Sequence, residues 1–179
     1  IGPFLEMVQR QSASSPAQAA ILPKWIGIHQ KLLRTLSQQN MLMAMFSNTI
    51  PLVVQALEQT QDPSTLKYIA FAVEIFGGNS AEIDHSFQEL LSHLTNVVTS
   101  QSNLSDATEL LQAYFECLQR YVLYCPRALC WNPQFATILT LSVQSIAALQ
   151  GAKESTRAGL NFLSQLFGWN LLRLSPQAQ

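Results

Sequence analysis

The chain has 179 residues, of which 48% are hydrophobic and 12% charged, and its formal net charge is −1. That hydrophobic content suffices for one large core or for about four stacked repeats. The charged share is about half of the roughly 25% of an average soluble domain. We therefore expect a segment of a longer protein whose neighbouring repeats cover its two ends. The three cysteines, an odd number with irregular spacing, argue against a disulfide framework and fit a reducing compartment.

Helix signals run along the whole chain, whereas strand and hairpin signals are nearly absent. The pattern predicts eight helices, at residues 3–13, 16–39, 41–60, 63–76, 81–99, 106–124, 132–149 and 153–174. Two stretches without charge, 35–57 and 128–152, are long enough to raise the question of a membrane span. Both contain too many polar residues, so we expect buried helices and no membrane insertion.

Several residues mark where these helices begin, bend or end. Asp62, Asp106 and Asn132 are expected N-caps, and Glu109 would complete a capping box with Asp106. Pro51 is expected to kink or break the third helix, because an interior proline lacks a hydrogen-bond donor and clashes with the preceding turn.

Two segments 91 residues apart read almost alike, 64–77 and 155–168. Aromatic residues recur near half that distance, which gives a period in the mid-forties at Trp25, Phe71, Phe115 and Phe162. A helical repeat of this length is typical of HEAT and armadillo arrays, in which each helix pair buries its apolar stripe against its neighbours. We therefore expect an all-α fold, an α-α superhelix (a HEAT/ARM-type solenoid) of about four helix pairs. The approximate repeats are 1–40, 41–78, 79–131 and 132–179.

The second helix of each predicted pair carries polar residues at helical spacing. In a HEAT-type array this helix lines the concave side. The candidate partner-binding residues are Lys67, Glu74, Glu109, Gln112, Glu116, Arg120, Arg157 and Asn161. The same stripes could equally be a solvated face with no partner.

The middle of the chain is acidic. Residues 68–119 contain seven acids and no Lys or Arg, the acids being Glu74, Glu82, Asp84, Glu89, Asp106, Glu109 and Glu116. Such a region would attract a basic protein and repel nucleic acid, so we expect no direct nucleic-acid partner. The alternative is an ordinary density of acids in which only the lack of bases is unusual.

No reaction motif occurs in the chain, so we expect no enzyme, no catalytic residue, no metal and no cofactor. His85 and His93 are eight residues apart, too far for the helical spacing of a metal-binding pair. We expect both to be exposed, and we expect Trp25, Trp131 and Trp169 to pack between helices.

Three runs carry a family resemblance: residues 106–115, residues 124–129, and residues 156–167 with the core Phe162-Leu163-Ser164-Gln165-Leu166. Together they resemble the importin-β (karyopherin-β) superfamily, and most of all its transportin-SR and importin-13-type branch. The resemblance covers about the last 120 residues.

The resemblance implies a superhelical nuclear transport receptor of the cytoplasm and nucleus. Such a receptor binds protein cargo on its concave side, binds the GTPase Ran in its GTP form and contacts Phe-Gly nucleoporins. Cargo of this branch is basic or Arg/Ser-rich, which an acidic concave middle would suit. Two other hypotheses remain: a generic HEAT-repeat scaffold for complex assembly, not linked to Ran, and a helical regulatory region of an enzyme.

Overall fold

The computed structural model describes residues 39–101, 103–104, 106–148 and 152–168, together with Lys24, Gly27, Ile28 and Lys31. This part of the chain is helical and contains no strand, which confirms the all-α prediction. The helices are α3 (Gln39–Thr60), α4 (Pro63–Phe76), α5 (Ala81–Thr99), α6 (Thr108–Tyr124), α7 (Pro126–Cys130), α8 (Phe135–Ala148) and α9 (Lys153–Gly168). No helix among the described residues has both the length and the apolar character that crossing a membrane requires. The expected helix 3–13 and most of the helix 16–39 lie outside this part of the chain.

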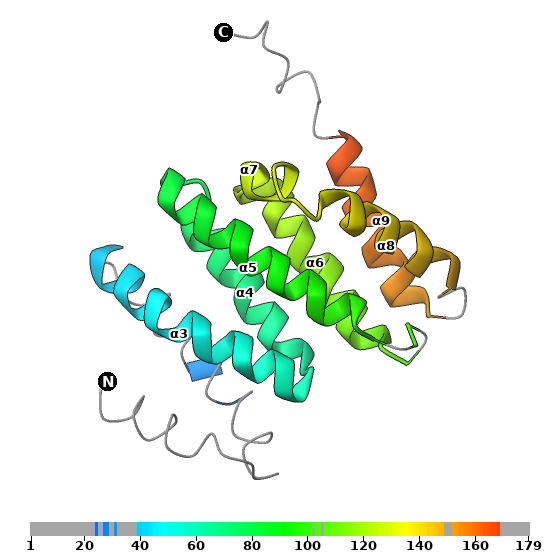
Figure 1. The fold of residues 1–179 in the computed structure, drawn as a ribbon, viewed down its shortest axis with the longest axis horizontal. Coiled ribbons are helices and arrows are strands. Elements are labelled where there is room, and N and C mark those ends of the chain that lie inside the picture. The colour runs from blue at the N-terminus through cyan, green and yellow to red at the C-terminus, as the bar shows by residue number, and fades with distance from the viewer. Residues whose placement is uncertain are drawn as a thin grey trace, which may run out of the picture.

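Helix α6 lies at the centre of the arrangement, packed between α4 and α9 (Figure 1). Helices that follow one another in the chain also pack in pairs, α3 with α4, α5 with α6, and α8 with α9. Helix α3 additionally contacts α5, and Figure 1 shows α5 crossing in front of α4 and α6. The second helices of the three pairs therefore form a row.

Three of the four recurring aromatic residues lie in this row and are buried. Phe71 belongs to α4, Phe115 to α6 and Phe162 to α9. The rings of Phe115 and Phe162 are stacked, with centroids 6.4 Å apart and an interplanar angle of 17°. Trp25 lies outside the described residues. The similar segments 64–77 and 155–168 differ in one respect: Phe76 is fully buried, whereas its counterpart Phe167 is 65% exposed.

Helix α4 begins and ends as its residues predict. The Asp62 side chain accepts a hydrogen bond of 2.8 Å from the Ser64 backbone N–H, which satisfies one of the free donors of the first turn. Beyond the last turn, Gly78 adopts a φ of +74°, a conformation that glycine reaches without steric cost. A β-carbon on Gly77 would lie 2.6 Å from the Val73 carbonyl oxygen and 2.9 Å from that of Tyr124. The two glycines thus let the end of α4 approach the end of α6.

At Pro51 and Asp106 the structure differs from the prediction. Helix α3 continues through Pro51, so the expected break does not occur, and the residues that follow, Val53 and Leu57, are fully buried. This packing outweighs the backbone hydrogen bond that the proline removes. Asp106 does not cap α6: the helix starts at Thr108 without a side-chain cap, and the Asp106 carboxylate accepts a hydrogen bond from Asn103 instead.

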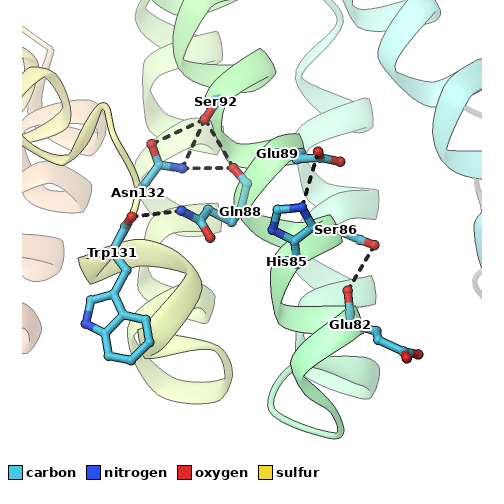
Figure 2. Close-up of polar contacts among 8 residues, drawn as sticks. All are labelled: Glu82, His85, Ser86, Gln88, Glu89, Ser92, Trp131 and Asn132. Carbon is cyan, nitrogen blue, oxygen red and sulfur yellow. Dashed lines mark hydrogen bonds and ion pairs between the residues drawn. The ribbon is translucent and has the colours of Figure 1, made fainter.

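The connection between α6 and α8 also differs from the prediction. A short helix, α7, begins at Pro126, in the interval between the predicted helices 106–124 and 132–149. The Asn132 side chain accepts a hydrogen bond from the Gln134 backbone N–H, and α8 begins at Phe135 instead of Pro133. Trp131 does not pack between helices, because it is 70% exposed. Its carbonyl oxygen accepts a hydrogen bond from the Gln88 side chain of α5, as Figure 2 shows.

Candidate interaction surface

Only one strip of α6 is open to solvent. Its neighbours bury nine residues: Leu110, Leu111, Ala113, Tyr114, Phe115, Cys117, Leu118, Tyr121 and Val122. The side chains left exposed or half-buried recur at steps of three or four, which is the spacing of one helix face: Thr108, Glu109, Gln112, Glu116, Gln119, Arg120, Leu123 and Tyr124. The four polar residues predicted from the spacing of α6 lie in this strip, which also contains Gln119 and ends at the exposed Leu123 and Tyr124.

The helices on either side of α6 expose the other predicted residues. On α4, Lys67 and Glu74 are exposed, and on α9, Arg157 and Asn161 are exposed. Because α6 packs against both helices, we treat the eight predicted residues of α4, α6 and α9 as one surface, called the polar face from here on.

Side-chain contacts link α6 to α4 and to α9 at this surface. The Glu74 carboxylate of α4 forms an ion pair with the Arg120 guanidinium of α6, with 3.7 Å between Oε2 and Nη1. Between α6 and α9, the Gln119 side chain donates a 3.2 Å hydrogen bond to the Ala158 carbonyl oxygen. These contacts bring the stripes of neighbouring helices within side-chain reach of one another.

The polar face has mixed charge instead of the acidic surface that the run of acids suggested. Arg120 pairs with Glu74, Arg157 pairs with Glu154, and Glu116 accepts a 2.9 Å hydrogen bond from Gln112. The acids that are consecutive in the sequence are divided in space, because α5 carries Glu82, Asp84 and Glu89 while α4 and α6 carry those of the polar face. Among the described residues, a base from outside residues 68–119, Arg120, pairs with an acid of the polar face, and none pairs with the acids of α5.

The described residues offer no grouping of three or more His, Cys, Asp or Glu side chains that could hold a metal ion. His85 and His93 are exposed, as predicted, and His85 lies 3.5 Å from the Glu89 carboxylate. Burial raises the pKa of the Cys125 thiol to about 12, and its hydrogen bond to Asp84 adds to the shift. Burial likewise raises the pKa of the Cys117 and Cys130 thiols. Thiols that stay protonated at neutral pH are poor nucleophiles and poor metal ligands.

The polar face therefore offers charged side chains and amides to a partner. Comparison of the chain with protein-family models, with curated proteins and with solved structures gives no match.

Proposed function

We propose that the chain is a segment of a nuclear transport receptor of the importin/transportin type, built as a HEAT-type solenoid. The observation that supports this most strongly is the row of α4, α6 and α9, each preceded in the chain by a helix that packs on it. Stacked helix pairs of this kind are the architecture of repeat solenoids. The equivalent burial of Phe71, Phe115 and Phe162 adds to that support.

In this proposal the polar face is the concave, cargo-contacting side. Glu109 and Glu116 would contact Arg or Lys side chains of a basic or Arg/Ser-rich cargo, since neither forms an ion pair with a Lys or Arg of the described residues. Gln112 and Asn161 would add side-chain hydrogen bonds. The whole receptor would bind Ran in its GTP form, contact Phe-Gly nucleoporins and move between cytoplasm and nucleus, without catalytic activity or a cofactor.

The experiment is a pull-down of the full-length protein with immobilised Ran, loaded in parallel with GTP or GDP. Retention that depends on GTP, together with release of an Arg/Ser-rich peptide when Ran-GTP is added, is the expected result. Equal retention on both forms, or none on either, would contradict a transport receptor.

A generic HEAT-repeat scaffold for complex assembly, not linked to Ran, is the second candidate. The mixed charge of the polar face favours it, because ion pairs such as Glu74–Arg120 leave less charge to attract a strongly basic cargo. A scaffold would bind its partner irrespective of the Ran nucleotide, so the same pull-down separates the two functions.

A further inference from the structure

A groove with a volume of about 670 Å³ lies between α3 and α5, away from the residues of the polar face. Its apolar lining consists of Ile50, Pro51, Val54, Ile83 and Leu90. Leu90 is buried and contributes to the core, while Ile50, Val54 and Ile83 are half-buried and Pro51 is exposed. The lining therefore offers apolar surface that the described helices do not fully cover.

Three carboxylates lie around this apolar lining. Glu58 comes from α3, and Glu82 and Glu89 come from α5. All three are exposed. Helices α3 and α5 run in the same direction in Figure 1, so Glu82 lies towards one end of the groove and Glu58 and Glu89 towards the other.

Among the described residues, no Lys or Arg lines this groove and none forms an ion pair with its carboxylates. Figure 2 shows the only partner of the Glu89 carboxylate there, the imidazole of His85. The neighbouring Ser86 hydroxyl is directed at the Glu82 backbone carbonyl, which leaves the Glu82 carboxylate without a hydrogen bond from it. The groove thus combines apolar surface with negative charge that no Lys or Arg of the described residues neutralises.

We propose that the α3–α5 groove binds a short basic peptide segment that places one apolar side chain between two Lys or Arg residues. Opposite charge at both ends of the groove would orient the segment, and the apolar lining would hold the side chain between them. This inference does not rest on the transport function, because it involves neither Ran nor the polar face.

The spacing of the carboxylates sets the spacing of the bases in the peptide. Glu82 and Glu89 are seven residues apart, which corresponds to about 10 Å along the axis of α5. A chain in the extended polyproline II conformation covers the same distance in about three residues, at roughly 3.1 Å each, and places side chains i and i+3 on the same side. The peptide that fits therefore has its bases at positions i and i+3, with the apolar residue between them.

The test is an NMR titration of the isotope-labelled chain with the capped peptide Gly-Lys-Leu-Ala-Lys-Gly. We expect the largest amide shifts at α3 and α5, around Val54 and Leu90. Replacing the peptide leucine by glycine should abolish saturation. The double variant Glu82→Lys/Glu89→Lys should weaken binding at least about tenfold, since it exchanges attraction for repulsion at two points.

A matched double variant, Glu109→Lys/Glu116→Lys, changes the net charge equally on α6 and should leave the affinity for this peptide within about twofold. If the α5 substitutions perturb the circular dichroism spectrum, Glu82→Gln/Glu89→Gln replaces them, with an expected loss of about threefold or more. Unchanged binding in the α5 variants, or equal weakening in the α6 variant, would overturn the proposal. So would a free protein that is dimeric by sedimentation and becomes monomeric in the α5 variant, because the occupant would then be a second copy of the chain.

Discussion

The polar face and the α3–α5 groove both contain acids from the base-free stretch 68–119, yet they differ in charge. At the polar face, Arg120 reaches Glu74 and Arg157 reaches Glu154. In the groove, no Lys or Arg joins Glu58, Glu82 or Glu89 within the described residues. Among the described residues, packing thus brings bases from outside the stretch to the polar face and none to the groove. A run of like charge in a sequence therefore does not predict a surface of like charge, since helix packing decides which residues become neighbours.

The largest expected effect comes from removing the packing that holds α6 beside α9. Phe115→Ala should lower the free energy of unfolding by about 3–5 kcal/mol, because it deletes a fully buried ring that stacks on Phe162. Chemical denaturation monitored by circular dichroism would measure the change. Phe167→Ala, at a 65% exposed ring, is the control and should change stability by less than about 0.5 kcal/mol. Equal effects of the two variants would mean that α6 and α9 are not packed as described.

The interior between the two surfaces can be tested by pH. The Tyr121 hydroxyl donates to the Phe87 carbonyl of α5, and the Tyr114 hydroxyl lies 2.9 Å from that of Thr95. Burial raises the pKa of both tyrosines above 10, and it also raises that of Tyr68. A folded-state pKa above the unfolded one gives stability that is complete below about pH 10 and is lost as the pH rises further.

We therefore expect unfolding between about pH 10 and 12, with a loss of about 1.4 kcal/mol per pH unit for each buried tyrosine. Denaturant titrations at several pH values would measure the slope. Tyr121→Phe is the matched variant. It should lower the free energy of unfolding at neutral pH by about 1 kcal/mol. Above pH 10 its free energy of unfolding should fall less steeply than that of the wild type, by about 1.4 kcal/mol per pH unit, because one titrating tyrosine is missing. A variant with the slope of the wild type would show that Tyr121 is accessible to solvent and that α5 does not cover it.

The smallest expected effect is the coupling free energy between Glu74 and Arg120 at the polar face. The Glu74–Arg120 ion pair should have a coupling free energy below about 1 kcal/mol in a double-mutant cycle with Glu74→Gln and Arg120→Gln, because both side chains are more than one third exposed. Raising the salt concentration should reduce it further. A parallel cycle with Glu89→Gln and Arg120→Gln joins residues of the two surfaces and should show no coupling. Coupling of similar size in both cycles would mean that the two surfaces are not electrostatically separate.

The helices that could be predicted from the sequence are those whose signals are local. Residues 81–99 form the predicted helix α5, and the Asp62 cap follows from side-chain chemistry within a few residues. The break expected at Pro51 and the cap expected at Asp106 do not occur, because distant packing decides the first position and a competing partner, Asn103, decides the second. The domain boundaries of the four repeats stay a prediction.

The polar face could be predicted in its residues but not in its charge. Helical spacing selects Glu109 and Arg120 as members of one strip, whereas the pairing of Arg120 with Glu74 depends on which helices are neighbours. The groove could not be predicted, since it requires the contact between α3 and α5, residues separated by some thirty positions. The exposure of Trp131 was also not predicted, because its hydrophobic character suggested burial and no local signal indicated otherwise.

A crossed binding experiment with two peptides decides whether the polar face and the groove are separate binding surfaces. Affinities of an Arg-Ser repeat peptide and of Gly-Lys-Leu-Ala-Lys-Gly are compared for the wild type, Glu109→Lys/Glu116→Lys and Glu82→Lys/Glu89→Lys. The account predicts that the α6 variant loses only the Arg-Ser peptide and that the α5 variant loses only the leucine-containing one. If both variants weaken the binding of both peptides to the same extent, the peptides respond only to the overall charge of the chain. The polar face and the groove are then not separate binding surfaces.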